Sequence, residues 1–281
     1  MKAAPFAYAR AASLRDAFEK FAAADNPRWL SGGQSLLPAL ALRLDAPGTL
    51  IDISRLAELR GITLSGGVLR IGAATRHAEL ATDPLVAQHA PLLAQAAPHI
   101  AHPAIRNRGT LGGSLALADP AAELPACALA LDATLVLEGP GGERRVKAEH
   151  FFTGLYETTR QPDEIVAALE VPPAAPGWRS CLMELTRRHG DYAIVGLAAQ
   201  ARVAEGKILE ARLAYFGVGA VPTRAHSAEA ALPDVSAAQA ALAHDLDPPS
   251  DLHGPPALRM HLARVLLGRV AAGLGAGRLG A

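Results

Sequence analysis

Ser31-Gly32-Gly33-Gln34-Ser35-Leu36-Leu37-Pro38 is the first of two glycine-rich loops that organise this chain, and the second is Ile105-Arg106-Asn107-Arg108-Gly109-Thr110-Leu111-Gly112-Gly113-Ser114. Each loop has paired glycines flanked by small hydroxyl residues. Because glycine has no Cβ, the backbone amides of such a loop can come close to an anion. Two loops of this kind that converge on one ligand suit a long dianionic group such as a dinucleotide pyrophosphate.

Neither loop fits the common nucleotide-binding motifs. The first lacks the Gly-Lys-Ser/Thr ending of a phosphate-binding P-loop. The only literal G-x-G-x-x-G is Gly275-Ala276-Gly277-Arg278-Leu279-Gly280, one residue before the C-terminus. Since no helix can follow it there, we predict a flexible tail at this position.

Length and composition limit the class of protein. The 281 residues allow one large domain or two ordinary ones, and half of them are hydrophobic, which is enough for a sizeable core. The formal net charge is zero, which argues against nucleic acid or an anionic membrane as the main partner. No stretch reaches the roughly 18 uninterrupted apolar residues of a membrane span, and the start of the chain is unlike a signal peptide.

The two cysteines, Cys127 and Cys181, have no C-x-x-C spacing. Both lie in apolar surroundings, so buried free thiols are favoured over a disulfide. A reduced cytoplasmic compartment fits this usage.

Local patterns predict the main elements. Ser13 is typical of an N-cap, and the residues after it predict an amphipathic helix over 14–23. Two β-rich runs around Gly66-Gly67 predict a hairpin over 62–71. Further expected elements are strands at 29–30, 50–53 and 134–138 and a buried helix over 121–131, capped by Asp119-Pro120.

Pro172-Pro173-Ala174-Ala175-Pro176-Gly177 is the strongest linker signal, so we place a domain boundary near residue 175. The pattern changes after it. Strands are expected at 180–185, 200–203 and 208–218, and helices at 225–232, 237–243 and 258–270.

Several long motifs in the same order resemble the FAD-binding (medium) subunit of the xanthine dehydrogenase family of molybdenum hydroxylases, whose members include the flavoprotein subunits of carbon monoxide dehydrogenase. The resemblance covers nearly the whole chain. The motifs that carry it are Gly32-Gly33-Gln34-Ser35-Leu36, Ile105 to Ser114, Ala118-Asp119-Pro120-Ala121-Ala122-Glu123-Leu124-Pro125, Arg187 to Val195, Pro222-Thr223-Arg224-Ala225 and Leu258-Arg259-Met260-His261-Leu262.

This resemblance implies an α+β fold. Residues 1–175 would form a PCMH-type FAD-binding domain, with subdomains at about 1–57 and 58–175. Residues 176–281 would form a smaller C-terminal α/β domain of the CO dehydrogenase flavoprotein type, with a three-stranded sheet and helices. FAD would lie extended between the subdomains and the C-terminal domain.

The resemblance also assigns the cofactor-binding residues of the two loops. Their backbone amides, with the Ser35 hydroxyl, would bind the pyrophosphate, although from the residues alone each loop can also be an ordinary tight turn. The assigned residues are Ser31, Gly32, Gly33, Gln34, Ser35 and Leu36 in the first loop and Thr110, Leu111, Gly112, Gly113 and Ser114 in the second.

The remaining cofactor-binding residues lie outside the loops. Glu123 matches an acidic position that binds a sugar of FAD, and Tyr192 matches an aromatic that lies against the flavin ring; a solvated helix residue and a core tyrosine are the alternatives. Ile100 and Ile165 match apolar and backbone contacts to the cofactor. Glu184 departs from the family pattern, since many relatives carry a lysine near this position. Either the match to the family is shifted locally, or the flavin potential or the electron acceptor of this protein differs.

No metal site is expected, because His77, His99 and His102 near the loops have no ligand spacing and an iron–sulfur cluster needs four cysteines. The resemblance implies an oxidoreductase subunit without catalytic residues of its own. Its partners would be a molybdopterin-binding large subunit and a small subunit with two [2Fe-2S] clusters, in a heterotrimer or its dimer, with NAD, a quinone or oxygen as electron acceptor. A self-contained flavin oxidoreductase, like the cell-wall enolpyruvyl reductases, and a scaffold that has lost its cofactor stay open as alternatives.

Overall fold

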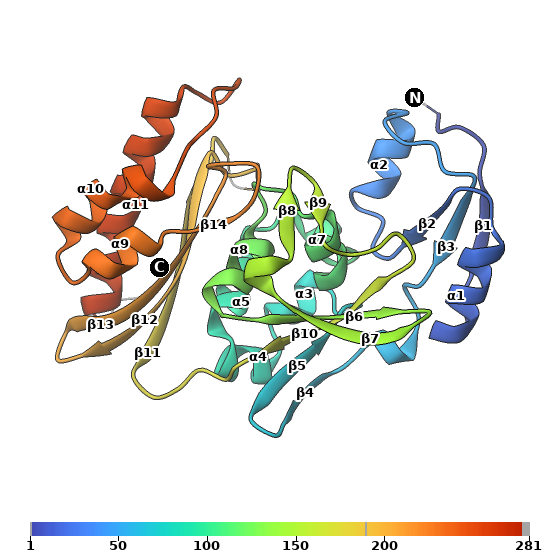
Figure 1. The fold of residues 1–281 in the computed structure, drawn as a ribbon, viewed down its shortest axis with the longest axis horizontal. Helices are drawn as coiled ribbons and strands as arrows, with labels where there is room; N and C mark the ends of the chain where they lie inside the picture. The colour runs from blue at the N-terminus through green and yellow to red at the C-terminus, as the bar shows by residue number, and fades with distance from the viewer. Residues whose placement is uncertain (1, 189, 277–281) are drawn as a thin grey trace.

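The computed structural model describes residues 2–188 and 190–276. They form an N-terminal part, a central part and a C-terminal part, which follow one another along the chain and across the molecule (Figure 1). Among these residues, every helix is too short or too polar to span a membrane.

The N-terminal part is a small parallel sheet with two helices. Its strands are ordered β1-β3-β2. The predicted helix over 14–23 is confirmed, and the Ser13 hydroxyl accepts a hydrogen bond from the Asp16 amide at 3.1 Å, as an N-cap does. The elements are β1 (Ala7–Arg10), α1 (Leu14–Ala23), β2 (Pro27–Leu30), α2 (Leu36–Ala41) and β3 (Thr49–Asp52).

The central part is an antiparallel five-stranded sheet, ordered β4-β5-β10-β6-β7, with helices on one face. The predicted hairpin is confirmed, with Gly66 and Gly67 at positive φ in its turn. Its strands are β4 (Ile62–Ser65), β5 (Val68–Gly72), β6 (Thr134–Gly139), β7 (Gly142–Lys147) and β10 (Ile165–Val171), beside the small pair β8 (Phe152–Gly154) and β9 (Glu157–Thr158).

The helices of the central part include the predicted buried helix, with a later start. It begins at Glu123, because Asp119 accepts a hydrogen bond from the Ala121 amide in a turn that precedes the helix. The helices are η1 (Ala57–Leu59), α3 (His77–Leu80), α4 (Pro84–His89), α5 (Pro91–Ala96), η2 (Ala97–His99), α6 (Pro103–Arg106), α7 (Leu111–Leu117), α8 (Glu123–Ala130) and η3 (Ala148–His150).

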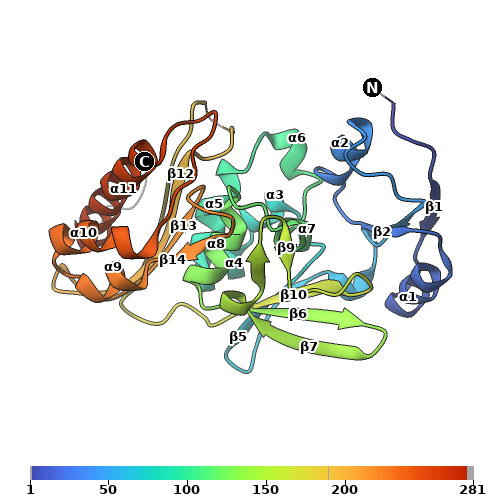
Figure 2. The same cartoon turned by 45° about the horizontal axis from the view of Figure 1, so that its top comes forward.

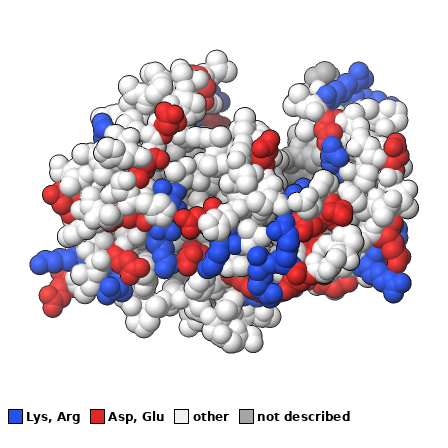
Figure 3. Space-filling model, in the orientation of Figure 1, with Lys and Arg blue, Asp and Glu red and all other residues white. Residues whose placement is uncertain are grey.

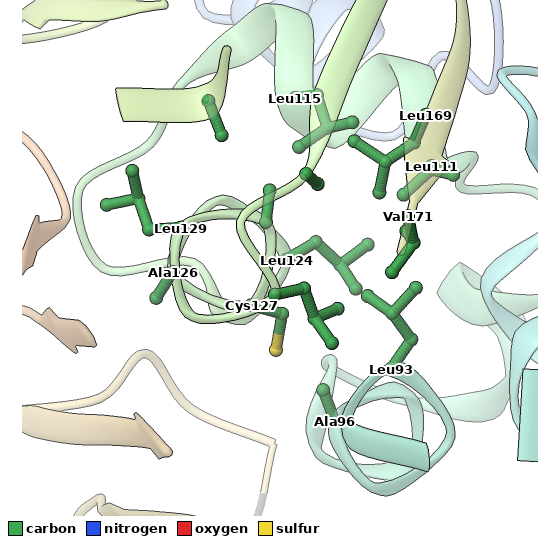
Figure 4. Close-up of a cluster of buried hydrophobic side chains, with 14 of the residues drawn as sticks. Leu93, Ala96, Leu111, Leu115, Leu124, Ala126, Cys127, Leu129, Leu169 and Val171 are labelled. Carbon is green, nitrogen blue, oxygen red and sulfur yellow. The ribbon is translucent and has the colours of Figure 1, made fainter. Parts of the chain in front are cut away.

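The two faces of the five-stranded sheet differ in chemistry. On the helix-covered face, Leu93 of α5, Leu124 and Cys127 of α8 and Leu169 of β10 meet in one buried cluster (Figure 4). On the other face, Arg70, Arg145 and Glu170 form ion pairs across β5, β7 and β10, at 2.8 and 3.0 Å. The space-filling view shows charged side chains gathered over this region (Figure 3).

The C-terminal part is an antiparallel sheet covered on both faces. Three long strands are present as predicted, and a two-residue strand makes the sheet four-stranded, ordered β11-β12-β13-β14. The helix α11 packs on one face, whereas α5 and α8 of the central part pack on the other (Figure 1). The elements are β11 (Trp178–Leu185), β12 (Val195–Ala204), β13 (Lys207–Phe216), β14 (Thr223–Arg224), α9 (His226–Ala231), α10 (Val235–Asp245) and α11 (Pro256–Ala276).

Position 196 of this sheet has room only for a glycine. It pairs with Phe216 on the neighbouring strand, and a Cβ at Gly196 would clash with the Phe216 ring, which is fully buried. We therefore expect Gly196→Ala to lower the free energy of unfolding by about 1–3 kcal/mol, the usual cost of overpacking a core. Thermal unfolding measures this, with Gly141→Ala as the control, because a Cβ there meets nothing within 4 Å. An unchanged midpoint would contradict the argument.

Both cysteines are free and buried, as the sequence predicted. Burial raises the pKa of the Cys127 thiol. The domain boundary near residue 175 falls between β10 and β11 and stays a prediction. The predicted flexible tail is wrong for its first two residues, Gly275 and Ala276, which end helix α11, and the rest of it lies outside the described residues.

Candidate functional site

All three parts of the chain contribute to the wall of one cavity of about 920 Å³. This volume lies near the upper end of the range for small-molecule and cofactor pockets. The cavity runs along the junction between the N-terminal and central parts, where the space-filling view shows a hollow (Figure 3). Figure 2 shows α2, which follows the first glycine-rich loop, and α6, which leads into the second, on the same side of the molecule.

Most of the residues assigned from the sequence line this cavity. Two do not. The Leu111 side chain is fully buried in the hydrophobic core (Figure 4). Glu184 of β11 lies behind the wall, with Oε1 3.2 Å from His99 Nδ1. Those that line the cavity are Ser31, Gly32, Gly33, Gln34, Ser35, Leu36, Ile100, Thr110, Gly112, Gly113, Ser114, Glu123, Ile165 and Tyr192.

The first glycine-rich loop offers free backbone donors. It connects β2 to α2, and Gly33 adopts a φ of +73° that side-chain-bearing residues disfavour. Within the described chain, the amides of residues 32–35 donate no hydrogen bond to another protein group. Consecutive free amides in a tight loop form a concave anion-binding surface.

The second loop presents hydroxyl groups instead. The amides of residues 111–114 are already paired, because this end of the loop forms the first turn of α7 and bridges to the segment after β5. The Thr110 and Ser114 side chains therefore supply its polar groups at the cavity wall. The paired amides are those of Leu111 with Thr75 O, Gly112 with Ala73 O, Gly113 with Thr110 Oγ1 and Ser114 with Thr110 O, at 2.8 to 3.1 Å.

The two loops are in direct contact. Ser31 Oγ lies 2.9 Å from Thr110 Oγ1. A Cβ on Gly32 would clash with the carbonyl oxygen of Arg108 and lie 2.9 Å from Gly109 Cα. The glycine at position 32 is thus required for the loops to meet.

An acidic group lies at the end of the cavity nearest the C-terminal part. Burial, with a smaller contribution from the neighbouring Glu184, raises the pKa of Glu123 to about 8. Its carboxyl group is therefore largely protonated at neutral pH. Burial also raises the pKa of Asp119, which is 7% exposed and lines the cavity.

Asp119 was missed by the sequence analysis, which interpreted it only as a helix cap. The signal was its place four residues before Glu123, in the same motif. Tyr156 donates a hydrogen bond to its carboxylate at 3.4 Å. Tyr192, 66% exposed, forms part of the wall beside it, so this end of the cavity reaches the surface at an aromatic side chain.

The opposite end of the cavity is aromatic and was not predicted. Phe21 stacks on Trp29, with ring centroids 4.1 Å apart, and both rings line the cavity. Trp29 Nε1 donates to the carbonyl of Pro162 at 3.1 Å. Arg160 completes this end. No motif marks these residues, since Phe21 and Trp29 lie more than 100 positions before Arg160 and Pro162.

Within residues 2–188 and 190–276, no group of three or more His, Cys, Asp or Glu side chains is placed to hold a metal ion. The groups that line the cavity have the chemistry of an organic anion site. The cavity offers free amides and hydroxyls in the middle, with aromatic groups at both ends.

Comparison with known proteins agrees with this chemistry. Residues 4–174 match the family described as the FAD binding domain in molybdopterin dehydrogenase, and residues 180–274 match the CO dehydrogenase flavoprotein C-terminal domain. The 6-hydroxypseudooxynicotine dehydrogenase complex subunit alpha of Paenarthrobacter nicotinovorans is 39% identical over 281 aligned residues, covering 97% of this chain and 95% of that protein.

Solved structures are similar over the whole chain. Carbon monoxide dehydrogenase from Hydrogenophaga pseudoflava has a chain with a TM-score of 0.94 and 37% identity, and quinoline 2-oxidoreductase from Pseudomonas putida 86 has one with a TM-score of 0.93 and 38% identity; each comparison covers 100% of both chains. The protein therefore belongs to the family of FAD-binding medium subunits of the molybdenum hydroxylases.

Proposed function

We propose that this chain is the electron-transfer subunit of a heterotrimeric molybdenum hydroxylase. In this proposal, electrons pass from the [2Fe-2S] clusters of a small subunit through FAD to NAD, a quinone or oxygen, while a molybdopterin-binding large subunit oxidises the substrate. The observation that carries the proposal is the cavity at the junction of the three parts, whose free amides, hydroxyls and aromatic ends suit a dinucleotide.

The residues present fit FAD. The free amides of residues 32–35 would hold the pyrophosphate, with the hydroxyls of Thr110 and Ser114 opposite them. FAD supplies one- and two-electron redox chemistry when it is bound.

The chain's own role toward the flavin ring is positioning and exclusion of water. Tyr192 would lie against the ring and Glu123 would bind a sugar hydroxyl, with Ile100 and Ile165 as apolar walls. The ring would then lie at the end of the cavity that opens to the surface, where a partner subunit can approach.

The redox partners must lie on other chains. The two cysteines are too few for an iron–sulfur cluster and are both buried. Relatives of this chain are named as subunits or medium chains of dehydrogenases. We further propose a cytoplasmic location, on the ground that both cysteines are free thiols.

The first test of the proposal is an absorption spectrum of the purified chain after incubation with FAD and desalting. We expect flavin bands that persist and FAD that is released on denaturation. A chain that stays colourless with added FAD, both alone and with its co-expressed partner subunits, would overturn the proposal and favour a scaffold.

Removal of FAD from the assembled complex tests the electron route. The FAD-free complex should lose reduction of the physiological acceptor and regain it when FAD is added. Full acceptor reduction without FAD would contradict the proposed route. Oxidation of a small substrate by the isolated chain would favour the self-contained oxidoreductase.

A further inference from the structure

His77 lies at the start of α3, at the cavity wall, and no role has been assigned to it. Its side chain is buried, with the residue 6% exposed. Neither ring nitrogen meets the geometry of a hydrogen bond to another group of the described chain, although the Thr110 backbone interacts with the ring and the ring lines the cavity. Leaving a buried polar group unpaired is destabilising, so native proteins normally provide a partner.

The position of the ring is determined by the second glycine-rich loop. The His77 amide donates to the Gly109 carbonyl at 3.1 Å. A Cβ on Gly109 would lie 2.8 Å from both Cε1 and Nδ1 of His77, so the ring packs directly against this glycine. Gly109 Cα in turn lies against Gly32 of the first loop. The imidazole is therefore placed beside the meeting point of the two loops.

The surroundings favour an anion as the missing partner. Arg76 and Arg106 act on the His77 ring electrostatically, and the free amides of residues 32–35 lie across the loop junction. Burial is the main reason that the pKa of His77 is lowered to about 4. The imidazole is thus neutral at pH 7 and carries one N–H donor.

We propose that His77 is a cofactor-binding residue whose imidazole N–H donates a hydrogen bond to a phosphate oxygen of the bound dinucleotide. This inference rests on the proposed FAD site, and it adds a side-chain donor to the backbone amides of the first loop. The ligand class it recognises is a pyrophosphate diester. The alternative is that the ring only fills space against Gly109.

Two substitutions separate a hydrogen-bonding role from a packing role. His77→Phe keeps a ring against Gly109 and removes the donor, whereas His77→Gln keeps an N–H donor and removes the ring. We expect His77→Phe to weaken FAD binding about tenfold, the effect of losing one hydrogen bond to a charged group. We expect His77→Gln to restore part of that loss.

The measurement is titration of the full-length apo chain with FAD, followed by flavin fluorescence, with ADP as a competitor that carries the pyrophosphate. His77→Phe should weaken the binding of FAD and the binding of ADP by a similar factor. The thermal midpoint of apo His77→Phe should be equal to or higher than wild type, because an unpaired buried polar group has been removed. His244→Phe, on exposed α10, is the control and should leave FAD affinity unchanged.

Unchanged FAD affinity in His77→Phe, or a defect in His77→Gln alone, would overturn the assignment and show a packing role. Weakened FAD binding with unchanged ADP binding would also overturn the assignment, since the lost contact would then lie outside the pyrophosphate. Failure of the wild-type chain to bind FAD would instead overturn the proposed site itself, so the two failures are distinguishable.

Discussion

Gly32→Ala is expected to weaken FAD binding by about 100-fold or more, which corresponds to the loss of two hydrogen bonds to a charged group. The added Cβ would clash with the Arg108 carbonyl oxygen, which is backbone and cannot rotate away. The two loops must therefore separate, and the Ser31–Thr110 contact and the free amides of the first loop move with them. Equilibrium dialysis or flavin fluorescence measures the affinity.

Two other glycines provide matched controls for this variant. Gly141→Ala should leave FAD affinity unchanged, because a Cβ there meets nothing within 4 Å. Gly113→Ala should have an intermediate effect, since its Cβ would meet only the Thr110 hydroxyl, at 2.8 Å, and a side chain can turn. Circular dichroism establishes that each variant is folded. Tight binding by a folded Gly32→Ala protein would show that the loop junction does not form the FAD site.

Glu123→Gln is expected to remove much of the pH dependence of the apo protein's stability between about pH 5 and pH 8. The pKa of Glu123 is raised from 4.5 to about 8 in the folded chain, chiefly by burial. Between these two values the folded state holds a proton that the unfolded state has released. Stability therefore falls as pH rises through this range and levels off above pH 8. The free energy of unfolding should fall by a few kcal/mol over this range. The full pKa shift would give a limit of about 5 kcal/mol, and the loss stays below it because water can enter the cavity.

The measurement is the urea-unfolding free energy of wild type and Glu123→Gln from pH 5.5 to 8.5. Neighbouring groups contribute in the same direction, since the pKa of Asp119 is raised by burial and that of His99 by its hydrogen bond to Glu184. The difference between the two proteins isolates Glu123, and Gln at this position should be stabilising at pH 8. Glu19→Gln on exposed α1 is the control. Parallel pH profiles for wild type and Glu123→Gln would refute a protonated Glu123 in the folded chain.

The structure shows what surrounds Glu184, the residue that stands where many relatives carry a lysine. Its side chain is 6% exposed, and Oε1 contacts His99 while Oε2 has no partner in the described chain. The residue acts on the cavity through Glu123, whose pKa it raises, and it is not itself part of the wall. An altered flavin potential therefore stays a prediction, to be tested with Glu184→Lys and Glu184→Gln.

What the sequence by itself determined was local. The capped helix at 14–23, the hairpin over 62–71 and the two glycine-rich loops depend on residues a few positions apart, so their patterns could be recognised directly. The order of the motifs along the chain was sufficient to identify the family and its cofactor.

Tertiary structure alone decided which groups the cavity presents. The amides of Leu111 and Gly112 in the second loop are paired with the segment after β5, whereas those of residues 32–35 in the first loop donate to no group of the described chain, and no local pattern distinguishes the two loops. The hydrogen bond from Trp29 to Pro162, the partnering of His99 by Glu184 and the place of His77 against Gly109 likewise arise between segments distant in sequence. Burial and pairing are properties of such contacts, and they determine whether an amide, a carboxyl group or an imidazole is available to a ligand.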